Sequence, residues 1–435
     1  MMSIINVIGG GLAGSEAVWQ LAKRGYKVRL FEQKPLKFSE AHSLSGLCEL
    51  VCSNSLKSNA ITGACGLLKE EMRRLDSITI KCADQTKVGA GGALAVDREK
   101  YSELVTEKIK SLENVEIIHG EITEIPDGIT IIATGPLTSG KLYENIMNLT
   151  GGDLHFFDAA SPIIKFDSVD MNSAFFQDRY DKGEGDGDYL NLPMNKEEYQ
   201  NFYQNLISAE RADLHVFEKK EIFESCMPIE IMASRGEDTI RFGPLKPVGL
   251  RDREGNRPYA VVQMRKENAN GDLYNMVGFQ TNLKFGEQKR VFSMIPALKN
   301  AEFVKYGVMH RNSYINAPNL LDHGVKFKSA NNLYFAGQIT GVEGYVESAM
   351  SGLICALQIH QTLQNKSAID FGNQTMIGAL VQYIGTENKN FQPMNANFGI
   401  IEMAEFRMIR NKQERYLKTA EKSLAIIEKI IENQL

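Results

Sequence analysis

A glycine-rich turn near the N-terminus constrains the fold of this chain more than any other feature. Gly9-Gly10-Gly11-Leu12-Ala13-Gly14 separates an apolar strand, residues 3–8, from a helical pattern over residues 15–24. In such a turn, the first glycine permits the tight bend, the second admits a pyrophosphate and the third allows close helix–strand packing. A second strand follows over residues 26–31, and Glu32 ends it, in position to bind a ribose hydroxyl. The pattern predicts a dinucleotide-binding βαβ unit.

Two later segments favour FAD over NAD as the dinucleotide. An apolar strand over residues 131–133 ends in Ala-Thr-Gly, with Gly135 as its glycine, which is typical of flavoproteins. A second strand, residues 332–336, runs into Gly337 and Gln338, and a helix is predicted from Tyr345 to Leu363. The N-terminus of that helix would face the flavin, where its dipole stabilises negative charge on the reduced ring. We therefore expect Gly135, Gly337, Gln338 and Tyr345 to join the glycine turn in binding FAD.

The order of these segments predicts an α/β fold with a divided nucleotide-binding domain. We expect a Rossmann-like FAD-binding domain of the glutathione-reductase type, with its first part in residues 1–155 and its second part in residues 300–365. Residues 156–299, where aromatic and β-branched runs alternate with Gly and Pro clusters, predict an inserted α+β substrate domain. Residues 366–435 predict a C-terminal helical segment, with apolar residues at helical spacing from Tyr416 to Ile431.

Composition limits the location and the chemistry. The chain has 435 residues, 43% of them hydrophobic, and contains no long apolar run that would span a membrane. No export signal is seen at the N-terminus, so we expect a cytoplasmic protein whose six cysteines are reduced. Those cysteines and the seven histidines lack metal-ligand spacing, so no metal site is predicted. The net charge of −5 restricts any RNA contact to local basic patches.

Many segments spread along the chain resemble one family, the folate/FAD-dependent tRNA (uracil-5-)-methyltransferases (TrmFO). The resemblance is carried by residues 11–17, 49–55 (Glu-Leu-Val-Cys-Ser-Asn-Ser), 67–73, 91–98, 185–189, 226–230 (Cys-Met-Pro-Ile-Glu), 242–244, 246–250, 278–281, 309–312, 336–348 and 390–399. Together these segments follow the order of the family over nearly the whole length of the chain.

The resemblance implies a methyltransferase that uses three small molecules. Methylenetetrahydrofolate would donate a one-carbon unit, FAD would accept it and supply electrons, and NADPH or NADH would restore the reduced flavin. The acceptor would be a uridine in the T loop of tRNA, or, in a paralogue, a uridine of 23S ribosomal RNA. Two further hypotheses remain open from the flavin pattern alone: an oxidoreductase acting on a small molecule, and a non-catalytic flavoprotein that binds RNA.

Uracil methylation requires one activated thiol and one proton acceptor. Carbon 5 of uracil becomes nucleophilic when a thiolate adds to carbon 6, and a base must later remove the carbon-5 proton. The family resemblance implies that Cys226 is the nucleophile and Cys52 the general base, although the residues alone leave their order open. The other four cysteines are expected to be buried packing residues: Cys48, Cys65, Cys82 and Cys355.

Substrate contacts are expected from three further groups of residues. His310 and Arg311 are candidates for binding folate or RNA, and Tyr345 for contacting the flavin or the pterin. Basic residues gather in two places, and each is a candidate for holding RNA phosphates or the folate tail. One group lies in the predicted insertion (Arg241, Lys246, Arg251, Arg253, Arg257, Arg265) and the other near the C-terminus (Arg407, Arg410, Lys412, Arg415, Lys418, Lys422).

Overall fold

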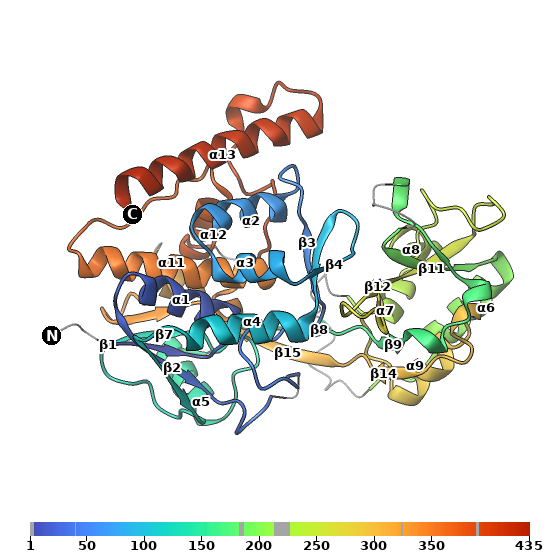
Figure 1. Ribbon diagram of the computed structural model, residues 1–435, viewed down its shortest axis with the longest axis horizontal. Coiled ribbons are helices and arrows are strands. Elements are labelled where there is room, and N and C mark those ends of the chain that lie inside the picture. The colour runs from blue at the N-terminus through green and yellow to red at the C-terminus, as the bar shows by residue number, and fades with distance from the viewer. Residues whose placement is uncertain are drawn as a thin grey trace.

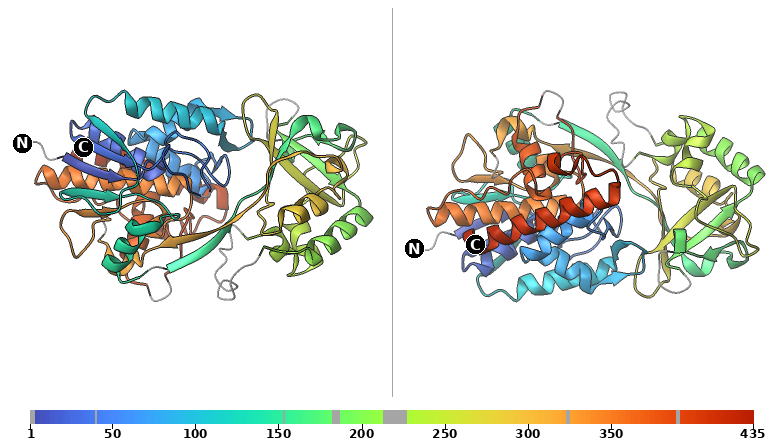
Figure 2. Two further views of the ribbon diagram at one scale, coloured as in Figure 1. Left: turned by 90° about the horizontal axis from the view of Figure 1, so that it is seen from below. Right: turned by 90° about the horizontal axis from the view of Figure 1, so that it is seen from above.

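Two lobes joined by a pair of long strands make up the protein (Figures 1 and 2). The computed structural model describes residues 4–39, 41–152, 154–181, 187–212, 227–322, 325–388 and 391–435. The connecting strands, β8 (Leu154–Ala159) and β15 (Met309–Tyr314), pair antiparallel between the lobes. The chain therefore leaves the first lobe along one strand and returns along the other.

The first lobe contains a parallel sheet of five strands in the order β16-β7-β1-β2-β6. These strands are β1 (Ile4–Ile8), β2 (Lys27–Glu32), β6 (Val115–His119), β7 (Ile129–Ile132) and β16 (Leu333–Phe335). β1 and β7, at the centre, are mostly apolar and mostly buried, because both faces of the sheet are covered there, whereas β2 alternates between buried apolar and more exposed polar residues. β16 lies beside β7, although about 200 residues separate them in the chain, so the two predicted parts of the nucleotide fold form one sheet.

Two helices pack closely beside this sheet. They are α1 (Leu12–Lys23) and α11 (Tyr345–Leu363), and α11 has the bounds predicted from the sequence. Their backbones come so near that a Cβ on Gly352 would lie 2.0 Å from the carbonyl oxygen of Ala13. A glycine is therefore required at this crossing, which holds the N-terminal turn of α1 beside the start of α11.

The second lobe is built on a sheet of six strands in the order β10-β11-β12-β13-β9-β14. Its strands are β9 (Ile163–Lys165), β10 (Phe175–Phe176), β11 (Tyr189–Met194), β12 (Ala260–Lys266), β13 (Leu273–Met276) and β14 (Phe303–Lys305). Its helices are α6 (Lys196–Ser208), α7 (Ile229–Ala233), α8 (Glu237–Phe242) and α9 (Phe285–Phe292). All pairings in this sheet are antiparallel, as expected for an α+β insertion.

The remaining elements surround the first sheet. A small antiparallel sheet of three strands comprises β3 (Ser55–Ser58), β4 (Lys87–Val88) and β5 (Ala93–Val96). The helices are α2 (Ala64–Arg74), α3 (Ile78–Gln85), α4 (Arg98–Lys110), α5 (Gly140–Thr150), α10 (Ala317–Leu320), α12 (Met376–Gly385) and α13 (Lys412–Gln434). α13 begins at Lys412 because the Asn411 side chain caps it, and it lies along the outer side of the lobe (Figure 1). Within the described ranges, no helix is long and apolar enough to cross a membrane.

Candidate active site

A pocket opens at the carboxyl ends of the parallel strands. It brings together residues that are far apart in the sequence but were predicted to bind one cofactor: Gly9, Gly10, Gly11, Leu12, Ala13, Glu32, Gly135, Gly337, Gln338 and Tyr345. Gly14, the one remaining residue of the predicted glycine turn, is not among the lining residues of the pocket, and its Cα faces the carbonyl oxygen of Gly9. The carboxyl edge of a parallel sheet is the usual place for a dinucleotide.

The three motif glycines have different surroundings. Gly9 has φ +101°, and a Cβ there would lie 2.5 Å from the carbonyl oxygen of Ala133. A Cβ on Gly14 would lie 1.8 Å from the carbonyl oxygen of Gly9. A Cβ on Gly11, by contrast, would have no heavy atom of the described chain within 4 Å. Gly9 and Gly14 are therefore required by the protein itself, whereas Gly11 leaves open space where a pyrophosphate can approach the backbone.

Glu32 is anchored at the end of β2 by two backbone amides. Its carboxylate accepts hydrogen bonds from Gly10 N at 2.7 Å and from Lys34 N at 2.9 Å. Because each carboxylate oxygen has two lone pairs, the group can still accept a hydrogen bond from a ribose hydroxyl. The bond to Gly10 also fixes the glycine turn against the end of the second strand.

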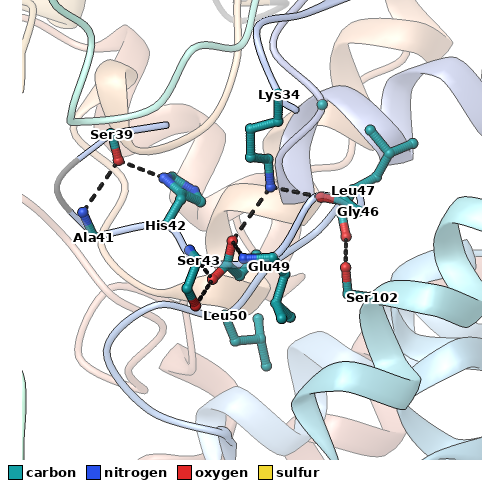
Figure 3. Close-up of polar contacts among 12 residues, drawn as sticks. Lys34, Ser39, Ala41, His42, Ser43, Gly46, Leu47, Glu49, Leu50 and Ser102 are labelled. Atoms are coloured by element: carbon teal, nitrogen blue, oxygen red, sulfur yellow. Dashed lines mark hydrogen bonds and ion pairs between the residues drawn. The ribbon is translucent and has the colours of Figure 1, made fainter. Parts of the chain in front are cut away.

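A buried ion pair holds the loop that follows Glu32 against the pocket (Figure 3). Lys34 Nζ lies 3.5 Å from the Glu49 carboxylate and donates to the carbonyl oxygen of Gly46 at 2.6 Å. Glu49 also accepts from Ser43 N at 2.7 Å and from Leu44 N at 3.0 Å. These contacts pin both ends of the loop with charge-assisted hydrogen bonds.

The same loop adds pocket residues that the sequence analysis did not single out. Lys34, His42 and Glu49 all line the pocket. Burial, followed by the nearby Lys34 charge, lowers the pKa of His42, so its imidazole is neutral at neutral pH. Of the three, Glu49 falls within a segment that resembles the family; Lys34 and His42 carry no local pattern that marks them.

Cys52 lies against Tyr345, the first residue of α11. The Tyr345 hydroxyl is 2.9 Å from Cys52 Sγ and accepts hydrogen bonds from the amides of Cys52, at 2.8 Å, and Ser53, at 3.1 Å. Tyr345 also lines the cofactor pocket, so its ring connects that pocket with the cysteine. Cys52 is half-buried.

Cys226 lies outside the described residues, but the residues on either side of its segment are well anchored. Ile229 N donates to the carbonyl oxygen of Gln280 at 2.7 Å, and Ala212 N donates to that of Asn282 at 2.8 Å. The buried carboxylate of Glu230 accepts from Asn282 N at 2.8 Å. Both ends of the segment that carries Cys226 are thus attached to one stretch of the second lobe.

His310 and Arg311 fall on β15, where they pair in register with Asp158 and Phe157 of β8. Their side chains lie outside what the structure describes. The strand itself passes beside the cofactor pocket, because Ser313 N donates to the carbonyl oxygen of the pocket residue Pro136 at 3.0 Å. The two residues thus belong to a strand that runs between the pocket and the second lobe.

The four cysteines expected to be packing residues are all buried: Cys48, Cys65, Cys82 and Cys355. Burial raises the pKa of the Cys48 and Cys82 thiols to about 12 and that of Cys65 to about 11. Such thiols stay protonated at neutral pH and do not act as nucleophiles. The prediction that they are packing residues is confirmed.

One candidate for holding an RNA phosphate or the folate tail, Arg265, is buried. Arg265 is 6% exposed, and its guanidinium group binds Asn54 and Ser53 rather than facing solvent. A buried guanidinium cannot hold an RNA phosphate. The basic group of the second lobe is therefore smaller than the sequence suggested.

Comparisons with known proteins agree with this geometry. The family model described as glucose inhibited division protein A (GIDA) matches residues 4–367. A curated relative from Acetivibrio thermocellus, named methylenetetrahydrofolate--tRNA-(uracil-5-)-methyltransferase TrmFO, is 57% identical over 435 residues, which cover 99% of each chain. The chain belongs to the TrmFO family. A further TrmFO relative, from Bacillus licheniformis, is 55% identical, again over 99% of both chains.

Solved structures confirm the fold expected for a TrmFO family member. The structure of Aquifex aeolicus GidA matches with a TM-score of 0.69 and 16% sequence identity, covering 99% of this chain and 75% of that one. At that level of identity the likeness concerns the fold alone. Together with the parallel sheet and its inserted antiparallel lobe, it confirms the predicted α/β class.

Proposed function

We propose that this chain transfers a one-carbon unit from methylenetetrahydrofolate to carbon 5 of a uridine in the T loop of tRNA, using FAD and NADPH or NADH. The observation that carries the proposal is the contact between Cys52 and Tyr345 at the wall of the cofactor pocket. It places a half-buried thiol beside the end of α11 that is expected to face a flavin. Membership of the TrmFO family supports both the donor and the acceptor.

The pocket residues fit FAD. The glycine turn over residues 9–14 would hold the pyrophosphate on the amides at the N-terminus of α1, and Glu32 would bind the ribose. Gly135, Gly337, Gln338 and Tyr345 would contact the flavin end. When bound, the flavin supplies the electrons that reduce the one-carbon unit to a methyl group. The space at Gly11, where a Cβ would meet no described heavy atom, supports this fit.

The chemistry at uracil is assigned to the two cysteines. Cys226 would add to carbon 6 of the ring, so that carbon 5 becomes an enolate carbon and attacks the one-carbon unit, whose bond to its carrier would break. Cys52 would then take the proton from carbon 5, and the bond between Cys226 and carbon 6 would break. Tyr345 would hold Cys52 in place for that proton transfer.

Substrate contacts and location complete the proposal. His310 and Arg311 would contact folate or RNA from β15, which passes beside the pocket residue Pro136. The exposed residues Arg407, Arg410 and Lys412 remain candidates for RNA phosphates. We place the enzyme in the cytoplasm. We retain the predicted domains 1–155, 156–299, 300–365 and 366–435, except that β14 is grouped with the insertion, because it joins the sheet of that domain.

The choice of RNA can be tested with purified protein. The enzyme would be supplied with FAD, NADPH and radiolabelled methylenetetrahydrofolate, and with either tRNA lacking 5-methyluridine or 23S rRNA lacking it. We expect label in 5-methyluridine of tRNA alone. Label confined to rRNA would overturn the choice of substrate, and turnover of NADPH without label in either RNA would favour an oxidoreductase instead. The alternatives are not favoured, because the relatives are named for tRNA methylation.

A further inference from the structure

Two arginines, one from each lobe, hold the segment that carries Cys52. Arg98, the first residue of α4, donates from Nη1 to the carbonyl oxygen of Leu50 at 2.8 Å, just before the cysteine. Arg265 of β12 donates from Nη2 to Ser53 Oγ at 2.9 Å and from Nε to Asn54 Oδ1 at 2.9 Å, just after it. The segment is therefore fixed on both sides of the reactive sulfur by guanidinium groups.

A buried glutamate connects the two arginines. Glu267 forms an ion pair with Arg98, and its charge also acts on Arg265, two residues before it in the chain. Glu267 is 5% exposed and Arg265 is 6% exposed. Removing one member of such a buried set leaves an uncompensated charge, so these contacts resist loosening.

The side chain of Asn54 completes the connection between the lobes. It is fully buried and donates to the carbonyl oxygen of Lys266 at 2.8 Å and to that of Val96 at 3.0 Å. A single side-chain amide group thus donates hydrogen bonds to β12 of the second lobe and to β5 of the first lobe. Any displacement of β12 would pull on Ser53 and Asn54, the two residues that follow Cys52.

We propose that Arg265 is a positioning residue for methyl transfer, which makes the placement of Cys52 against Tyr345 depend on the docking of the second lobe. That lobe also anchors both ends of the segment that carries Cys226. This inference rests on the proposed role of Cys52.

The test compares Arg265→Met with Arg290→Met, an exposed arginine of α9 in the same lobe whose side chain donates to Asn205 Oδ1 at 2.7 Å. Three quantities are measured on the FAD-loaded full chain: kcat and KM for tRNA methylation, the rate of flavin reduction by NADPH, and amide hydrogen exchange. Exchange is followed in a peptide that contains the Cys52 and Ser53 amides, with a peptide from β1 as the internal reference.

We expect Arg265→Met to lower kcat by at least about tenfold and to change KM for tRNA by less than about twofold. Flavin reduction should stay near the wild-type rate. The Cys52 and Ser53 amides, which donate to Tyr345, should exchange at least about tenfold faster, while β1 is unchanged. Arg290→Met should match the wild type in all three measurements.

Three results for Arg265→Met would overturn the inference. A raised KM at unchanged kcat would indicate a phosphate contact, and exchange in β1 that is as much faster as exchange near Cys52 would indicate a global loss of stability. The third is no change in any of the measurements. If Arg265→Met fails to fold, Ser53→Ala removes one acceptor of the same arginine and should shift kcat and exchange in the same direction. Cys52→Ala is assayed in parallel. If it methylates normally, the proposed function of Cys52 fails; if it is inactive while Arg265→Met behaves as wild type, only the positioning role fails.

Discussion

The Tyr345 hydroxyl and Cys52 Sγ lie within hydrogen-bonding distance of each other. The phenol oxygen already accepts hydrogen bonds from the amides of Cys52 and Ser53, which occupy its lone pairs, so its own hydrogen is left for the sulfur 2.9 Å away. Burial, with Cys52 beside it, raises the pKa of Tyr345 well above its ordinary value, so the phenol keeps this proton at neutral pH. A sulfur that accepts a hydrogen bond is prepared to carry negative charge, as a general base requires.

Replacing Tyr345 with Phe should separate this bond from the packing of the ring. Tyr345→Phe keeps the aromatic wall of the pocket but removes the donor to sulfur and the acceptor for two amides. We expect kcat for tRNA methylation to fall by at least about tenfold, with FAD still bound, since unmade hydrogen bonds of this kind cost about 1–3 kcal/mol each. Steady-state kinetics and the flavin absorption spectrum measure the two effects. An unchanged kcat would remove Tyr345 from the mechanism.

Gly11 and Gly14 offer a matched pair of substitutions in one motif. Gly14→Ala places a methyl group 1.8 Å from the Gly9 carbonyl oxygen, so it should lower the melting temperature of the FAD-free protein and weaken FAD binding as well. Gly11→Ala meets no described heavy atom within 4 Å, so it should leave the FAD-free melting temperature unchanged and weaken FAD binding alone. Thermal unfolding and FAD titration measure both. Equal destabilisation by the two variants would contradict the assignment of Gly11 to the pyrophosphate.

Glu71 should make stability depend on pH. Its buried carboxyl group accepts hydrogen bonds from Met376 N and Ile377 N, at 2.8 Å each, and from Ser423 Oγ. Burial raises its pKa from the ordinary 4.5 to about 7. Between these two values the unfolded chain loses the proton whereas the folded chain keeps it. The contribution of Glu71 to the free energy of unfolding is therefore full below pH 4.5, decreases as the pH rises and is lost above about pH 7.

Glu71→Gln should remove that slope. The free energy of unfolding of the wild type should fall relative to the variant by roughly 3 kcal/mol between pH 4.5 and pH 7.5. Denaturant unfolding at several pH values, with FAD saturating throughout, measures the difference. Parallel pH profiles for the two proteins would show that Glu71 does not titrate in this range.

The elements that bind the dinucleotide could be predicted because their signals are local. The glycine turn, the acid that ends β2 and the helix that begins at Tyr345 each depend on a short stretch of sequence, and each was found where predicted. The order of strands in the second lobe could not be predicted. Its pairing joins β9 to both β13 and β14, which lie more than 100 residues further along the chain, and no local periodicity encodes such partners.

The contacts around Cys52 could not be predicted for the same reason. Cys52 and Tyr345 are 293 residues apart, and Asn54 and Arg265 are 211 apart. The sequence made Tyr345 a candidate for contacting the flavin or the pterin, and Arg265 one for holding RNA phosphates or the folate tail. A residue type indicates which chemistry a side chain can do, but not the direction in which it faces. Only the packing of β12 against the segment after Cys52 turns that arginine inward.

The central claim, that Cys226 and Cys52 methylate uridine in tRNA, is tested most directly by following label from radiolabelled methylenetetrahydrofolate into tRNA lacking 5-methyluridine. Wild type, Cys226→Ala, Cys52→Ala and the control Cys82→Ala would each be loaded with FAD and supplied with NADPH. We predict that all four bind FAD, and that only wild type and Cys82→Ala place label in 5-methyluridine. Normal labelling by Cys226→Ala or by Cys52→Ala would contradict the account.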